Sequence, residues 1–184
     1  MAAPFLATLL VHASTELAPT SRIVGGSEVP EYRYPFLVSL RSFSSHICGG
    51  SLIEPSWVLT AAHCINPDRP ATSYSVMLHA HDKSSPSSTW HRCTQVISVA
   101  RTVCHPSYNS RTMLADICLL QLQGTATCGA ELAARGALSH LDAAGSGFDA
   151  PGRTVTVAGW GATSMSDGHS LAGRGANSRL LARE

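Results

Sequence analysis

Residues 57–64 read Trp57-Val58-Leu59-Thr60-Ala61-Ala62-His63-Cys64, an apolar run followed by a short alanine-rich stretch with a histidine. Tryptophan, valine and leucine favour a strand over 57–60, because such side chains fit a half-buried pleated surface. The alanines predict a helical turn over 61–65. The stretch therefore predicts a strand followed at once by a turn that carries His63.

Apolar runs of the same kind occur on both sides of this stretch. Runs rich in Val, Ile, Leu and aromatic residues alternate with loops of Ser, Pro, Asn and Gly. These runs predict strands over 36–40, 47–53, 57–60, 74–79, 94–104 and 117–122. Several short strands at this spacing indicate an all-β fold, either an antiparallel sandwich or a closed barrel.

The amino-acid composition changes after Gly124. Residues 125–150 are rich in Ala and Gly, with weak helical character over 130–140. One further strand is predicted over 153–158, running into Gly159-Trp160-Gly161. We therefore expect a barrel domain over 23–123, a linker over 124–152, a single strand over 153–161 and a disordered tail over 162–184.

Composition limits the partners. The 184 residues are 44% hydrophobic and 14% charged, with a formal net charge of +1. A balanced charge gives no reason to expect nucleic acid or an acidic membrane surface as partner. No run reaches the roughly 18 apolar residues of a membrane span. The six cysteines, an even number, favour an oxidising compartment.

The N-terminus indicates export. An apolar run over 4–11 precedes Val11-His12-Ala13, a tolerable cleavage site. We expect a signal peptide over 1–13, a propeptide-like segment over 14–22 and a secreted protein. The alternative is a poorly ordered tail or a wrongly chosen start.

Six short motifs, in order, resemble the chymotrypsin/trypsin family of serine endopeptidases. The resemblance covers about residues 23–161 and implies two six-stranded barrels with a cleft between them. The first antiparallel barrel would be complete here and the second only partly present. The motifs are Ile23-Val24-Gly25-Gly26, Cys48-Gly49-Gly50-Ser51-Leu52-Ile53, residues 57–64 as quoted, His105-Pro106-Ser107-Tyr108-Asn109, Asp116-Ile117-Cys118-Leu119-Leu120 and Gly159-Trp160-Gly161.

The resemblance implies roles for four residues. His63 takes the position of the general base, and Asp116 that of the buried carboxylate that orients it. Arg22 and Ile23 take the position of a zymogen cleavage site. In isolation, the histidine could be an ordinary surface or core residue, the aspartate a turn cap and the arginine part of a polar tail. No aspartate that could pair with a freed Ile23 amino group follows in the sequence.

The nucleophilic serine is absent from the sequence. The family places it in Gly-Asp-Ser-Gly-Gly-Pro, whose backbone N–H groups also form the oxyanion hole. Gly145-Ser146-Gly147 is the nearest string, but it precedes the Gly-Trp-Gly motif. The later serines lack a glycine turn: Ser164, Ser166, Ser170 and Ser178. We therefore expect these 184 residues to be catalytically incomplete.

The resemblance implies a Cys48–Cys64 disulfide. For the other cysteines, facing positions of an antiparallel hairpin have a nearly constant sum of residue numbers. That sum is 222 for Cys104 with Cys118 and 221 for Cys93 with Cys128, a difference that one bulge absorbs. The rival Cys93–Cys104 pair lies on a single strand and would require it to break. A third alternative leaves three of the last four cysteines free.

Two other functions compete with proteolysis. A metal site could use His79, His81, His91 and Cys93, but we interpret this segment as an exposed loop. Its single acid, Asp82, is too little carboxylate for calcium, so we expect no metal and no cofactor. The second alternative is a non-catalytic pseudo-protease that binds a protein partner, which could also cover the exposed face of the barrel. A complete relative would act on proteins or peptides.

Overall fold

The computed structural model describes residues 27–83, 87, 90–127, 152, 154, 156–160 and 180–183. Within these residues the chain is almost entirely strand, with two 3-10 turns, η1 (Ala62–Cys64) and η2 (Ala71–Ser73). None of the helices in this part of the chain is long and apolar enough to cross a membrane. The prediction of an all-β fold is confirmed.

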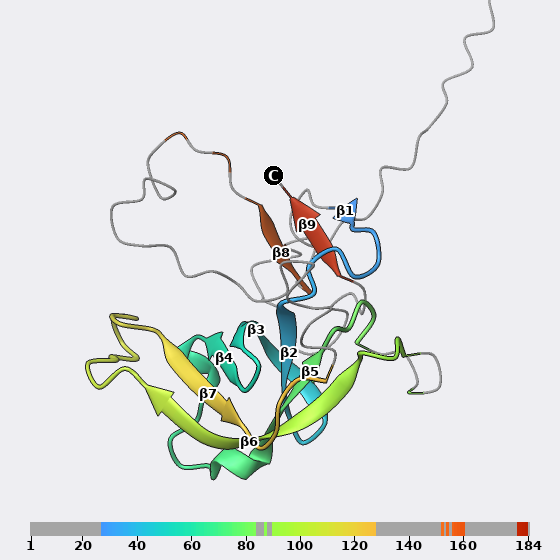
Figure 1. Cartoon of the computed structure of the whole chain (residues 1–184). Helices are drawn as coiled ribbons and strands as arrows, with labels where there is room; N and C mark the ends of the chain where they lie inside the picture. The colour runs from blue at the N-terminus through green and yellow to red at the C-terminus, as the bar shows by residue number, and fades with distance from the viewer. Residues whose placement is uncertain are drawn as a thin grey trace, which may run out of the picture.

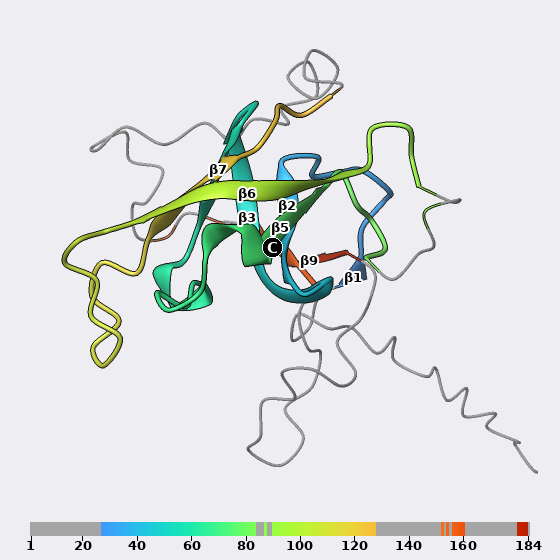
Figure 2. The same cartoon turned by 90° about the horizontal axis from the view of Figure 1, so that it is seen from below.

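Six strands form a closed antiparallel barrel (Figure 1). Around the barrel the order is β2-β3-β4-β7-β6-β5, and β2 pairs with β5 to close it. Figure 2 shows the same strands from below, with the long β6 crossing over the others. The strands are β2 (Leu37–Ser42), β3 (Ser45–Glu54), β4 (Trp57–Thr60), β5 (Tyr74–Leu78), β6 (Gln95–Cys104) and β7 (Cys118–Leu122).

The predicted strands and the observed ones agree closely. The strand β4 has the predicted bounds, and the turn η1 lies within the predicted 61–65. The largest differences among the barrel strands are two residues each: β2 ends two residues after the predicted 36–40, and β3 begins two residues before the predicted 47–53. A hairpin pairs Ser42 with Ser45, so backbone pairing extends each strand into polar residues that carry no apolar signal.

A small second sheet differs from three expectations about the chain. It has the order β1-β9-β8, with β1 (Ser27–Glu28), β8 (Val157–Gly159) and β9 (Leu181–Arg183). It lies above the barrel in Figure 1. The strand near 157 is therefore paired and not alone, and residues 181–183 are ordered, although they lie in the predicted disordered tail. Residues 27–28 lie outside the barrel, although they fall within the predicted 23–123 domain.

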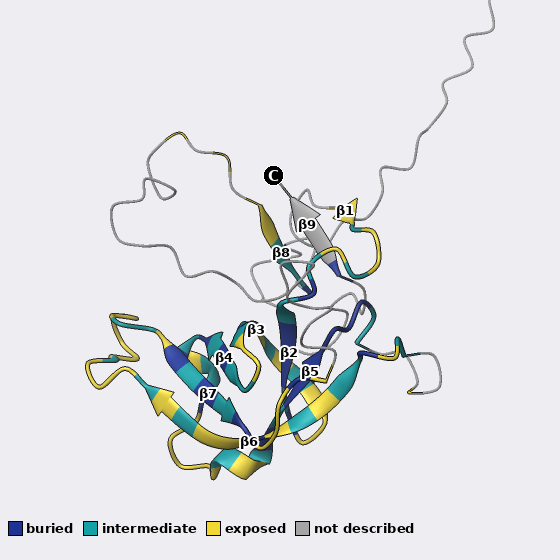
Figure 3. Ribbon diagram, viewed as in Figure 1, coloured by how far each residue is buried: buried dark blue, intermediate teal, exposed yellow. Residues whose placement is uncertain are grey.

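The barrel interior is the main core. Figure 3 shows mostly buried positions along β2 and β5, and buried positions that alternate with partly exposed ones along β7, as the pleat of a strand with one covered face requires. A second, smaller cluster joins the barrel to the ends of β8 and β9. It consists of Met77, Ala80, Trp160 and Leu180.

Two of the three predicted disulfides are present, Cys48–Cys64 and Cys104–Cys118. The second excludes the rival Cys93–Cys104 pair. The β6–β7 register shifts by one residue between Val99 and Arg101, the kind of bulge that the cysteine spacing predicted. Cys93 is also disulfide-bonded. Cys128 lies outside the described residues, so the third pairing stays a prediction.

Gly50 is the tightest glycine on the barrel strands. A Cβ added there would lie 2.9 Å from the Leu59 carbonyl oxygen and 3.0 Å from Val58 Cγ1. We predict that Gly50→Ala lowers the free energy of unfolding by about 1–3 kcal/mol, because the added methyl overpacks the contact between β3 and β4. Urea unfolding measures the change. Gly49→Ala is the matched control, since nothing lies within 4 Å of its added Cβ; equal effects of the two variants would contradict the packing argument.

His46 connects the barrel to the second sheet. Its ring packs edge-on against Trp160, with centroids 5.8 Å apart, and its Nδ1 lies 2.8 Å from the hydroxyl of buried Ser39. Burial, with smaller contributions from Lys83 and Arg41, lowers the pKa of His46 to about 4. The ring is therefore neutral in the folded chain at neutral pH.

This lowered pKa predicts a pH-dependent stability. Between about pH 6.5 and 4 the unfolded chain binds a proton at His46 that the folded chain does not, so the free energy of unfolding should fall as pH falls through this window. We predict that His46→Asn, whose amide oxygen can replace Nδ1, flattens this dependence in urea titrations. The exposed His105→Asn serves as control. An unchanged slope for His46→Asn would refute the assignment.

Candidate active site

Barrel pairing places His63 beside Asp116. The strands β4 and β7 run antiparallel with Thr60 opposite Cys118, so the end of β4 and the start of β7 meet at the same end of the barrel. His63 follows β4 in η1, and Asp116 precedes β7 by two residues. The two residues are 53 positions apart in sequence and adjacent in space.

Asp116 receives two hydrogen bonds from His63. The backbone N–H of His63 donates to Oδ1 at 2.8 Å, and the ring Nδ1 lies 2.7 Å from Oδ2. The pKa of Asp116 lies below its ordinary value. The hydrogen bond from the His63 ring is the largest cause, and the hydrogen bond from the His63 backbone is the next. An ionised carboxylate only accepts hydrogen bonds, so Nδ1 carries the proton and Nε2 of a neutral ring carries the lone pair.

The Nε2 atom of His63 faces a sulfur. Within the described residues its contact is the Sγ atom of Cys64, at 3.5 Å. The His63 side chain is 49% exposed and that of Asp116 is 20% exposed, so the ring can be reached from solvent. The geometry is that of a histidine base oriented by a carboxylate, with the nucleophile position not filled by a described hydroxyl group.

Several predicted positions lie outside the described residues. These are the Arg22–Ile23 cleavage site, the Gly145-Ser146-Gly147 string and the serines at 164, 166, 170 and 178. The cleavage site at Arg22 and Ile23 stays a prediction, and so does the expectation that none of these serines is the nucleophile.

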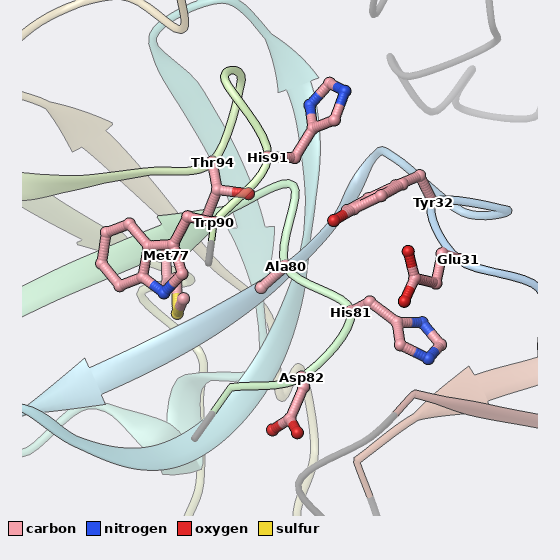
Figure 4. Close-up of a pocket in the computed structure, with 9 residues that line it drawn as sticks. All are labelled: Glu31, Tyr32, Met77, Ala80, His81, Asp82, Trp90, His91 and Thr94. Carbon is pink, nitrogen blue, oxygen red and sulfur yellow. The ribbon is translucent and has the colours of Figure 1, made fainter. Parts of the chain in front are cut away.

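Two histidines of the rejected metal site, His81 and His91, line a separate cavity of about 190 Å³ (Figure 4). Tyr32 stacks on His79 with ring centroids 4.6 Å apart, and His91 packs at 4.7 Å from both rings. The third histidine, His81, lies 3.0 Å through Nε2 from the Glu28 carboxylate. The rings of His79 and His91 therefore pack with Tyr32, and the ring of His81 pairs with an acid.

One cluster in the described residues brings three possible metal-binding atoms together. The sulfurs of Cys48 and Cys64 and a ring nitrogen of His63 lie within 4.8 Å of one another. In the folded chain these sulfurs are bonded to each other and are not available as thiolates. Sequence reasoning treated Cys48 and Cys64 as structural only, although the adjacency of His63 and Cys64 in the chain was a signal that the sulfur lies near the base.

Comparisons with known proteins show which family the chain resembles. A family model described as Trypsin matches residues 23–184, beyond the last motif at Gly161. Serine protease 57 of Rattus norvegicus is 38% identical over 144 residues, or 78% of this chain and 49% of the relative. The Mus musculus Serine protease 57 is 38% identical over 141 residues, 77% of this chain and 46% of the relative.

Ovochymase-2 of Mus musculus is 37% identical over 142 residues, 77% of this chain and 22% of the relative. The chain thus spans about half the length of the two Serine protease 57 relatives and a smaller share of Ovochymase-2.

The two bonds to Asp116 predict which nitrogen of His63 carries the proton. In Asp116→Asn, the backbone N–H of His63 needs the amide oxygen, so the amide NH2 faces Nδ1 and the neutral ring should carry its proton on Nε2. Nitrogen-15 NMR of the ring distinguishes the two tautomers. Asp68→Asn, an exposed change in the loop after η1, is the control. A proton that stays on Nδ1 in Asp116→Asn would contradict the geometry.

Proposed function

Because the chain belongs to the trypsin family of serine proteases, we propose that the domain it comes from hydrolyses peptide bonds in proteins. His63 is the general base and Asp116 the carboxylate that orients it. The observation that carries the proposal is the paired hydrogen bonding of His63 to Asp116, at 2.8 Å through its backbone and 2.7 Å through its ring.

The proposed chemistry is acyl transfer. The lone pair on His63 Nε2 accepts the proton of a serine hydroxyl as its oxygen attacks the scissile carbonyl, and the imidazolium then donates that proton to the leaving amine. Asp116 keeps the ring in the required tautomer and stabilises the positive charge. Its lowered pKa supports this role, since the carboxylate is ionised at neutral pH.

We propose that residues 1–184 do not perform this reaction by themselves. No serine in the sequence lies in the glycine turn of the family, and that turn would also supply the oxyanion hole. With both missing, even the residual catalysis that survives loss of one triad member is not expected.

Secretion and activation are part of the same proposal. Disulfides persist in oxidising compartments, which supports an extracellular site of action. The apolar segment over 4–11 and the Arg22–Ile23 bond support a signal peptide and a zymogen that is activated by cleavage.

A protein-binding role without catalysis is the second candidate. It is favoured by four exposed apolar side chains on the β6–β7 hairpin, a surface typical of contact sites. They are Val103, Met113, Leu114 and Ile117.

A chimera tests the function. We would join residues 23–160 to the serine-bearing remainder of a trypsin-family protease and treat it, beside the 184-residue chain, with a fluorophosphonate probe. We predict labelling of the chimera and none of the 184-residue chain. Asp116→Asn in the chimera should lower kcat about 10⁴-fold, as the equivalent change does in the family's template enzyme.

Two results would overturn the proposal. Specific labelling of the 184-residue chain would remove the claim of inactivity. A folded chimera that hydrolyses peptides equally well with His63→Ala would remove His63 as the base. His105→Ala is the matched control, because His105 is an exposed histidine that follows β6 and whose backbone N–H donates to the Ile117 carbonyl.

A further inference from the structure

The sulfur of Cys64 lies beside Nε2 of His63, which places two kinds of metal-binding atom at this end of the barrel. We propose that reduction of the Cys48–Cys64 disulfide creates a zinc site made of Cys48, His63 and Cys64. The proposal does not depend on the proteolytic function, because it needs only the positions of these three side chains.

The distances fit a tetrahedral zinc ion. Zinc binds sulfur at about 2.3 Å and imidazole nitrogen at about 2.0–2.1 Å, so a nitrogen and a sulfur on one tetrahedral ion lie about 3.5 Å apart. His63 Nε2 and Cys64 Sγ are already 3.5 Å apart. Two sulfur ligands lie about 3.8 Å apart. After reduction the two cysteine side chains can rotate to that separation while their Cα atoms remain 6.2 Å apart.

The ring of His63 is already prepared as a ligand. A histidine that binds metal usually donates its other N–H to a carboxylate, which fixes the tautomer and makes the ligating nitrogen more basic. Asp116 does this at Nδ1, at 2.7 Å, and leaves the Nε2 lone pair directed toward the sulfurs. Asp116 is therefore a positioning residue of the proposed site and not a ligand.

The site is open to solvent. His63 is exposed and both cysteines are partly exposed, so an ion can enter and a water molecule can take the fourth position. An ion on Nε2 would occupy the lone pair that a general base needs.

The chemistry balances with a dithiol as reductant. One thiolate of the dithiol attacks a sulfur of the Cys48–Cys64 bond, and its second thiol closes the dithiol's own disulfide. This releases the two cysteine thiols. Zinc then replaces the two thiol protons, which leave to solvent.

The second described disulfide provides an internal comparison. Cys104 is followed in sequence by His105, as His63 precedes Cys64, but His105 Nδ1 accepts a hydrogen bond from the Ser107 backbone at 3.1 Å. Of the described histidines and cysteines, only those at 48, 63 and 64 bring three ligand atoms together. Sequence adjacency alone therefore does not create the site.

Cobalt(II) is the probe that tests the proposal, because tetrahedral thiolate coordination gives it characteristic absorption. The full chain is reduced with dithiothreitol, freed of it by anaerobic gel filtration and titrated with cobalt(II). We expect one ion per chain with sulfur-to-cobalt charge transfer, displaced by zinc. Asp116→Asn should weaken binding about 10–100-fold, and His63→Ala should weaken it further. His105→Ala should bind as the parent chain does.

Three results would overturn the proposal. They are the same absorption from the oxidised chain, no uptake by the reduced chain, and equal uptake by His63→Ala, which would indicate thiols binding without the barrel geometry. Circular dichroism accompanies each titration, and a reduced chain that unfolds and binds cobalt(II) without dependence on His63 counts against the site. The double variant Cys104→Ser with Cys118→Ser should retain binding, and its loss would assign the ion to the other pair.

Discussion

The pairing of β4 with β7 is the constraint on which the site depends. It is an internal seam of a closed barrel, and its register sets Thr60 opposite Cys118. Residues just after one strand and just before its antiparallel neighbour lie at the same barrel end. A shift of this register by one residue would move the carboxylate away from the ring and also turn every side chain of the strand to the other face of the sheet.

Two disulfides and one side-chain hydrogen bond stabilise the region where β4 pairs with β7. The Cys48–Cys64 bond ties the turn that carries His63 to β3, and the Cys104–Cys118 bond ties the start of β7 to β6. Thr60 adds a side-chain hydrogen bond to the Gly49 carbonyl at 2.8 Å. Both members of the histidine–aspartate pair are thus anchored within two residues of a disulfide, so little conformational entropy remains to be lost when they meet.

The chain therefore contains a histidine oriented by a carboxylate on a barrel with its own core. The small sheet of β1, β9 and β8 attaches to that barrel through Trp160, whose indole N–H donates to the His81 carbonyl at 2.9 Å and whose ring packs on His46. A partly buried neutral histidine at this junction, His46, links attachment of the second sheet to pH. The contact between His63 and Asp116 and the contacts that attach the second sheet through Trp160 therefore involve different residues.

The sequence by itself determined the six barrel strands, predicted the bulge between β6 and β7, and singled out His63 and Asp116, because apolar runs, cysteine spacing and motifs are local. It missed β9, since three residues carry no periodicity and pair only when β1 and β8 are in place. Only the tertiary structure decided that His63 Nε2 faces Cys64 and that His46 packs, partly buried, against Trp160. Such contacts depend on how separate strands close around one core, which no local pattern records.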